Sequence, residues 1–134
     1  MKFLAKTKDD ISRAAIDCFS FTHIILGFFG YFVLDSISYT ILGTSNTPIS
    51  LILLISFSII WELFENFVLL QFGIKFASRK DSVLNSVMDV IFFFGGGMVV
   101  MLSFYLDLSQ FLLFILIFFP STILTSFFYF YYLK

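Results

Sequence analysis

Four side chains that can bind a cation or carry a proton lie within long apolar stretches of the sequence: His23, Glu62, Glu65 and Asp89. Glu62 and Glu65 are three residues apart, so a helix places both carboxylates on one face. Carboxylates and an imidazole together suit Mn, Fe, Mg or Zn ions. The four residues are therefore a candidate metal site. Their spacing matches no known catalytic or metal-binding motif, so it identifies neither a reaction nor a catalytic or cofactor-binding residue.

Further polar residues repeat at helical spacing around these four. Asp81, Asn85 and Asp89 follow one another at intervals of four residues, and Asn66 lies four residues after Glu62. Residues with this spacing share one helix face. The residues expected to support the cluster are Asn66, Asp81, Ser82, Asn85 and Ser86.

The free-energy cost of charge in a membrane decides where these side chains point. An ionised residue near the centre of a span costs about 2.5–3.5 kcal/mol even on permissive insertion scales. We therefore expect the acids to face inward and to be neutralised there. The predicted spans contain no Lys or Arg, so His23 is the only internal cation, unless a basic side chain reaches in from the interface. The basic residues that could reach the cluster from the interface are Arg13, Arg79 and Lys80. Otherwise the acids must be neutralised by bound protons, by a metal ion or by a basic residue of another subunit.

The elements that position the cluster are apolar helices. Hydrophobic residues make up 60% of the 134 positions, charged residues make up 13%, and the mean hydropathy is +1.02. A soluble chain of this length cannot hide so much apolar surface. We expect an all-α polytopic membrane protein with one domain, residues 1–134. It consists of an N-terminal interfacial segment, 1–14, and a bundle of four transmembrane helices at about 15–36, 49–72, 82–105 and 110–132.

Local signals refine this arrangement. Asp81 is placed to cap the third span. Gly27, Gly30 and Gly96 lack side chains within the spans and are expected to let neighbouring helices approach closely.

Basic residues predict the orientation of the chain. All eight lie in the N-terminal segment, between the second and third spans, or at Lys134. With four spans these positions fall on one side of the bilayer. The positive-inside rule then places both termini on the cytoplasmic or matrix side, in a bacterial inner membrane or a mitochondrial inner membrane.

Three strings resemble a known family in order and spacing: THIILGFFGYF from Thr22, WELFEN from Trp61, and DSVLNSVMD from Asp81. They are similar to an uncharacterised family of polytopic membrane proteins, a domain of unknown function known mainly from alphaproteobacteria. The resemblance implies that the polar residues above and Gly27 are its key positions. Leu26 stands where the family tends to have a second His, and the family's extra N-terminal segment and its acidic residue in the last span have no counterpart here.

The sequence leaves three functions open. We expect a small structural or accessory subunit of a larger membrane complex, in which the polar cluster joins the helices. A metal-binding membrane protein or metal-dependent membrane enzyme is the alternative, with a divalent metal as cofactor. Proton or ion handling by the buried carboxylates is the second alternative. The expected partners are the lipid bilayer and other membrane subunits or a second copy; no basic patch supports nucleic-acid binding.

Overall fold

The structure is a computed structural model that describes residues 2–45, 47–75 and 78–132. These residues are helical without strands, apart from an isolated bridge between Leu4 and Ile16. The elements in chain order are a short 3-10 helix η1 (Lys8–Asp10), α1 (Ser20–Leu42), α2 (Thr47–Phe64), a π-helical turn η2 (Glu65–Leu69), α3 (Val83–Tyr105) and α4 (Gln110–Tyr132). The all-α class expected from the sequence is confirmed.

Three helical segments are long and apolar enough to cross a membrane. They are Ser20–Leu42, Thr47–Leu69 and Val83–Tyr105. Each has 23 residues, which at about 1.5 Å per residue exceeds the roughly 30 Å hydrocarbon thickness. The apolar stretch found in α4, Phe111–Phe127, is shorter. The membrane character of the chain is therefore supported by three spans, and the fourth span stays a prediction.

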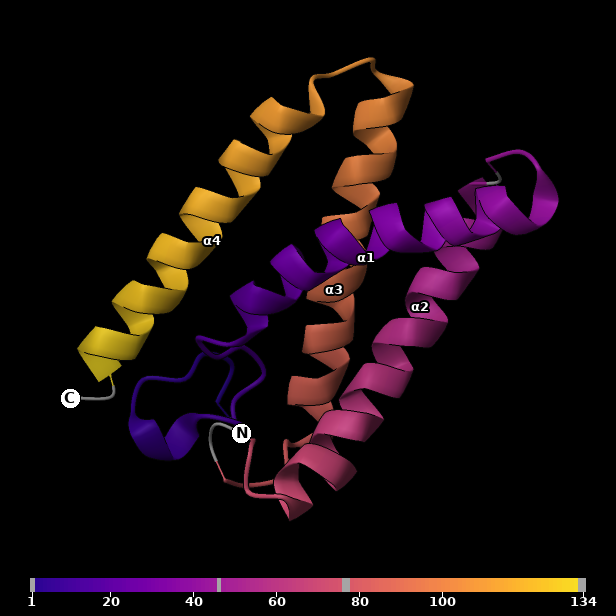
Figure 1. The fold of residues 1–134 in the computed structure, drawn as a ribbon. Coiled ribbons are helices and arrows are strands. Elements are labelled where there is room, and N and C mark those ends of the chain that lie inside the picture. Colours follow the sequence, from indigo (N-terminus) through magenta and orange to yellow (C-terminus); the bar gives the residue numbers. More distant parts are fainter. Residues whose placement is uncertain (1, 46, 76–77, 133–134) are drawn as a thin grey trace.

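The helices form an open bundle in which α1 packs chiefly against α3 (Figure 1). In this view the N-terminal segment, the end of η2 and the C-terminal end of α4 lie at the lower end. The connection between α3 and α4 lies at the opposite end. α4 leans away from α2 and contacts mainly α1.

Glycines set the distance between α1 and α3. A Cβ atom on Gly27 would lie 1.7 Å from the carbonyl oxygen of Phe93, and one on Gly96 would lie 2.0 Å from that of Ile24. Such distances are sterically impossible, so the two backbones can meet only because both positions lack a side chain. This close approach holds the N-terminal half of α1 against α3.

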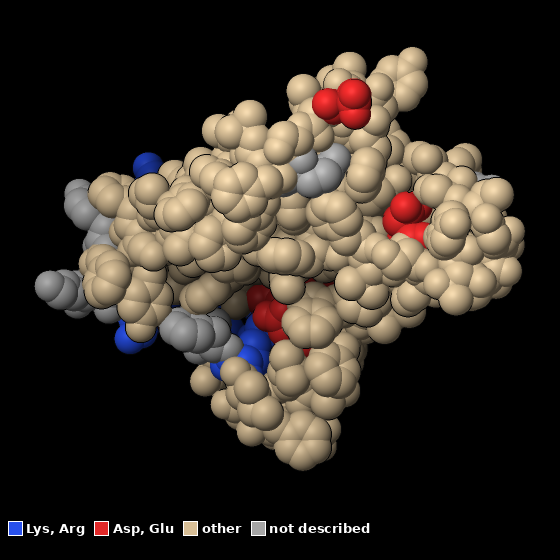
Figure 2. All heavy atoms as spheres, turned by 45° about the horizontal axis from the view of Figure 1, so that its top comes forward, with Lys and Arg blue, Asp and Glu red and all other residues tan. Residues whose placement is uncertain are grey.

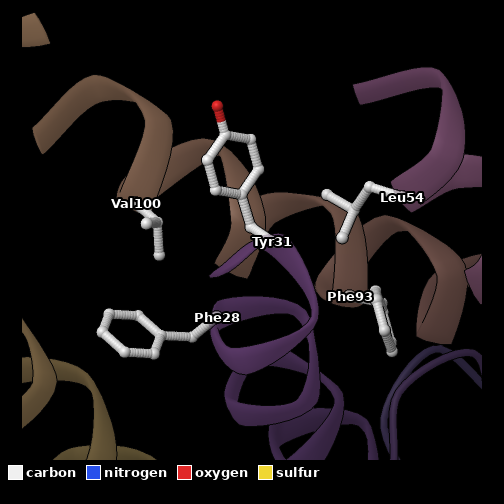
Figure 3. Packing of buried hydrophobic residues seen from close by; sticks show 5 residues of the cluster. All are labelled: Phe28, Tyr31, Leu54, Phe93 and Val100. Atoms are coloured by element: carbon white, nitrogen blue, oxygen red, sulfur yellow. The ribbon is translucent and has the colours of Figure 1, made fainter. Parts of the chain in front are cut away.

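A small apolar core lies above the polar cluster. Its buried residues come from three helices and are shown in Figure 3: Phe28, Tyr31, Leu54, Phe93 and Val100. Leu54 of α2 and Val100 of α3 are fully buried. The packing at this level fixes α1, α2 and α3 relative to one another, which is what the cluster requires.

The N-terminal segment is folded against the bundle. Ala14, Ala15 and Cys18 are buried, and the Ser12 carbonyl accepts a hydrogen bond of 2.7 Å from the backbone N–H of Ser82. Asp17 ends this segment, because its carboxylate accepts from the backbone N–H groups of Phe19 and Ser20 at 2.8 and 3.3 Å. This capping satisfies donors at the helix start, and α1 accordingly begins at Ser20 rather than near residue 15.

Candidate metal centre

The structure brings the four candidate ligands together from α1, α2, η2 and α3. Nε2 of His23 lies 3.2 Å from Oε1 of Glu62 and 3.9 Å from Oε2 of Glu65. Nδ1 of His23 lies 3.9 Å from Oδ1 of Asp89. The side chains of His23, Glu62 and Asp89 are 5–7% exposed, and that of Glu65 is 24% exposed. A buried charged cluster centred on His23 therefore exists.

The ring of His23 is oriented by its own helix. Nδ1 lies 3.1 Å from the carbonyl oxygen of Phe19, one turn earlier in the chain. A carbonyl only accepts, so the neutral ring carries its hydrogen on Nδ1 and leaves a lone pair on Nε2. Such a backbone contact fixes the tautomer of metal-binding histidines in the same way. Nε2, the free nitrogen, is the one that faces Glu62 and Glu65.

The π-helical turn supplies one wall of the cluster. α2 ends at Phe64, and η2 continues the same helix through Glu65 and Asn66. Single π-helical turns within α-helices are frequently found at functional sites. Here the Asn66 amide donates to the Glu62 carbonyl at 3.0 Å and lies 3.4 Å from Oε2 of Glu62. Asn66 thereby holds one oxygen of Glu62 and leaves the other free.

Lys75 is an internal cation that the sequence-based prediction missed. Its side chain is 3% exposed; the ammonium forms an ion pair with Asp81, donates to Oδ1 of Asn66 at 2.8 Å, and lies 3.8 Å from Oε1 of Glu65. The expectation that only His23 lies inside is therefore wrong. The glycine at position 73 was the sequence signal that could have indicated this path of the chain. It adopts a left-handed conformation, with φ of +70°, which ends the helix and can turn the next residues back towards the cluster.

The three basic residues expected to reach the cluster lie elsewhere. Arg79 lies 4.0 Å from a carboxylate oxygen of Asp9 and donates to its backbone carbonyl. Lys80 lies over the ring of Phe67, 4.5 Å from its centroid, and Arg13 is exposed. Among the described contacts, none joins the side chains of these three residues to the cluster.

The supporting residues join the start of α3 to its neighbours. The expectation that Asp81 caps this helix is wrong: the Ser82 hydroxyl is the cap and accepts from the backbone N–H of Asn85 at 3.2 Å. The Asp81 carboxylate is engaged by Lys75 instead. The Asn85 amide donates to the carbonyl of Ala15 at 3.4 Å, and the Ser86 hydroxyl accepts from Asn66 at 3.4 Å.

A cavity of about 230 Å³ borders the cluster. His23, Glu65 and Asp89 line it from the helices, and Lys75 and Asp81 line it from the connection before α3. Asp17 also lines the cavity, and no motif in the sequence predicted this position for it. Figure 2 shows acidic and basic atoms in a recess surrounded by uncharged surface. The cavity is smaller than the roughly 300–1,000 Å³ of pockets for drug-sized ligands, so it suits an ion or a small group.

Three buried polar atoms of the cluster have no hydrogen-bond partner among the described residues: Nε2 of His23, Oε1 of Glu62 and Oδ1 of Asp89. The first two are 3.2 Å apart without forming an aligned hydrogen bond. An unpartnered buried polar atom costs about 1–3 kcal/mol, and more when it is charged. Such atoms on side chains of one buried cluster are the pattern expected of ligands that lack their cation.

Two groups of ligand atoms are compact enough to surround an ion. One atom each from His23, Glu62 and Glu65 lie within 4.8 Å of one another, and so do one each from Glu62, Asp81 and Asp89. Three ligands spaced evenly around one ion at about 2.0–2.2 Å lie at most about 3.8 Å apart. A contraction of up to about 1 Å, within reach of side-chain rotations, therefore brings either group to bonding distance.

The fold and the cluster together define a helical membrane-type protein with a buried charged centre. The chain belongs to the family described as protein of unknown function DUF2585, whose model matches residues 3–129. The match covers the N-terminal segment and nearly all of α4 as well as the three strings singled out in the sequence. No curated protein and no solved structure matches the chain.

Proposed function

We propose that this protein binds a divalent metal ion in the membrane, with His23, Glu62 and Glu65 as ligands and Asp89 beside them. The observation that carries the proposal is the contact between Nε2 of His23 and Oε1 of Glu62. Two buried acceptor atoms face each other at 3.2 Å without a hydrogen bond, and a shared cation resolves this conflict.

The charge of the cluster supports the same proposal. Lys75 offsets Asp81, with which it forms an ion pair, and leaves Glu62, Glu65 and Asp89 without a full counter-charge. The donor atoms are one imidazole nitrogen and carboxylate oxygens, with no thiolate among them. This set favours Mn²⁺ or Fe²⁺, whereas closed structural zinc sites commonly use cysteine.

Elemental analysis of purified protein tests the proposal. The chain should be isolated in lipid nanodiscs without a polyhistidine tag, because such a tag binds the same metals. We expect at least about one equivalent of metal per chain in the native protein. Glu62→Gln should weaken binding by more than the roughly 10–100-fold that loss of an outer partner costs, since it removes a direct ligand.

Asp35→Asn is the matched control, because Asp35 lies in the C-terminal half of α1, away from the cluster. Its carboxylate accepts hydrogen bonds from Ser45 and Ser50 instead. This variant should keep the metal. Native protein that is free of metal and does not take up Mn²⁺ after dialysis would contradict the proposal.

A proton is the second candidate for the shared cation. The 3.2 Å separation of Nε2 and Oε1 also lies at the upper end of the length of N–H···O hydrogen bonds. Protonation of His23 would then make the cluster a proton-handling site, and the metal-free outcome above is the result that favours it.

The proposed setting is a bilayer crossed four times, with α4 as the fourth span. The N-terminal segment and the connection between η2 and α3 would face the cytoplasm or the matrix, in a bacterial inner membrane or a mitochondrial inner membrane. The role of accessory subunit in a larger complex stays a prediction. It was expected because the chain is short and has an apolar exterior. A larger complex was also one possible source of positive charge for the cluster, and Lys75 of this chain supplies part of that charge. Mild detergent extraction that yields only the free chain would count against it.

A further inference from the structure

The cluster contains a second group of ligand atoms that the single-ion proposal leaves unused. Glu62, Asp81 and Asp89 each offer one carboxylate oxygen, and these three atoms lie within 4.8 Å of one another. Glu62 also belongs to the first group, with His23 and Glu65. Each carboxylate oxygen has two lone pairs, so Oε2 of Glu62 can bind one ion while it accepts from Asn66 at 3.4 Å, and Oε1 can bind the other ion. The residue shared by both groups is therefore placed as a bridge.

An independent observation points to a ligand at this second position. Oδ1 of Asp89 has no hydrogen-bond partner among the described residues, although only 5% of the Asp89 side chain is exposed. Asp89 also lines the cavity. His23 does not satisfy this oxygen, because its nearest nitrogen is 3.9 Å away and faces the Phe19 carbonyl.

The charge of the cavity region calls for more than one divalent ion. Five carboxylates lie there, and Lys75 is the one ammonium among the described residues that line the cavity. With a neutral His23 the ionised cluster carries four negative charges. One divalent ion offsets half of them, and two offset all of them. The acids concerned are Asp17, Glu62, Glu65, Asp81 and Asp89.

We infer that the cluster holds two divalent metal ions bridged by Glu62, a centre of the class in which carboxylates join a pair of Mn²⁺ or Fe²⁺ ions. His23 and Glu65 complete the first site, and Asp81 and Asp89 complete the second. Metal pairs of this kind lie about 3.5–4 Å apart and clamp the oxygens of a small anionic group between them. The inference rests on the proposed single-metal function and extends it.

Lys75 has a defined part in this arrangement. Its ammonium pairs with Asp81, one of the ligands of the second site. Lys75 and the second ion therefore compete for the same carboxylate, and the second ion binds less tightly than the first. The connection between η2 and α3 can release Lys75 without breaking a helix, because the residue lies outside both elements.

Manganese binding tests the inference with two readouts. Chain in nanodiscs is stripped with a chelator and dialysed against Mn²⁺; the metal is counted by mass spectrometry, and the ions are examined by electron paramagnetic resonance. We expect two Mn²⁺ per chain and the broad signal of two coupled ions. Asp81→Asn should reduce the count to one and restore the six-line signal of an isolated Mn²⁺.

Lys75→Met keeps the inference testable should the Asp81 variant fail to fold. Removing the ammonium should shift the second step of the Mn²⁺ titration to lower concentration, whereas a purely structural role of Lys75 would not tighten metal binding. Asp35→Asn is again the control and should keep two coupled ions.

The outcomes separate the two proposals. One Mn²⁺ per chain in the native protein, unchanged in Asp81→Asn, overturns the two-ion centre and leaves the single-metal function standing. No bound Mn²⁺ in the native protein overturns both.

Discussion

Lys75 is the residue on which the charge balance of the cluster most depends. Its ammonium is buried and contacts Glu65 and Asn66 of η2 and Asp81 of the connection between η2 and α3. Asn66 uses one carbonyl oxygen to accept from both Lys75 and the backbone N–H of Asp81, each at 2.8 Å. The Lys75 side chain and Asn66 thus tie the start of η2 to the connection just before α3.

Lys75→Met should destabilise the metal-free protein. Removing one member of a buried ion pair leaves the other charge uncompensated, at a cost of about 3–5 kcal/mol. The free energy of unfolding in mixed detergent micelles, followed by circular dichroism in the presence of a chelator, measures this cost. The double variant Lys75→Met with Asp81→Asn should recover part of it, because it also removes the stranded carboxylate.

Lys80→Met is the matched control for that measurement. Lys80 is exposed and lies over the Phe67 ring, so its loss should cost less than about 1 kcal/mol. Equal losses for the Lys75 and Lys80 variants would contradict the structural role assigned to Lys75.

At the scale of elements, the close packing of α1 on α3 positions His23 relative to Asp89. Gly27 and Gly96 lie at the crossing, each against a carbonyl group of the other helix. Gly95 is adjacent in sequence but points to open space, with no atom within 4 Å of its Cβ position. Neighbouring glycines of the same helix therefore have opposite roles.

Gly96→Ala should force the two helices apart. Its Cβ would lie 2.0 Å from the Ile24 carbonyl oxygen, and overpacking of this kind costs about 1–3 kcal/mol. Because the helices carry the metal ligands, Mn²⁺ affinity should fall together with the free energy of unfolding. Gly95→Ala should keep both or raise stability slightly, since alanine favours helix. A loss in Gly95→Ala equal to that in Gly96→Ala would show that the crossing is not as described.

The N-terminal segment carries its own electrostatic lock. The side chain of Lys2 and the backbone N–H groups of Lys6 and Thr7 hydrogen-bond to the Asp10 carboxylate. The Lys2 hydrogen bond is the main cause that holds the pKa of Asp10 at about 2, below the ordinary 3.8. The lock is therefore complete above pH 4 and weakens as the pH falls towards 2, because protonation removes the charge that Lys2 binds.

A carbon-13 NMR titration of the Asp10 carboxyl group checks this lock. The midpoint should lie at about 2 in the native chain and move towards 3.8 in Lys2→Met. A native midpoint near 3.8 would mean that the contact with Lys2 does not persist in solution.

At the scale of the whole molecule, the number of crossings decides which side of the membrane each end occupies. Three helical segments have the length and hydropathy of spans, and α4 follows α3 through a short turn at Leu106–Ser109. In Figure 1 the C-terminal end of α4 returns to the end of the bundle where the N-terminal segment lies. This return is what a fourth crossing produces.

Reporter fusions at the C-terminus should give the activity of a cytoplasmic location in bacteria. Green fluorescent protein should fluoresce there, and alkaline phosphatase should be inactive, because a fourth crossing would return the C-terminus to the side of the basic residues. A fusion at Thr44, between α1 and α2, should give the opposite pattern. High phosphatase activity at the C-terminus would show that α4 does not cross.

The membrane character of the chain, its helical class and the faces on which polar groups gather could all be predicted from the residues alone. These follow from local physics: apolar runs of about 20 residues favour spanning helices, and charges spaced by three or four residues share one face that lipid excludes. Tertiary structure decided which charges meet. The meeting of Lys75 with Asp81, of Asp17 with the cavity and of Gly96 with the Ile24 carbonyl depends on loop paths and helix crossings. Contacts between residues distant in the chain set those paths, and no local pattern of residues records them.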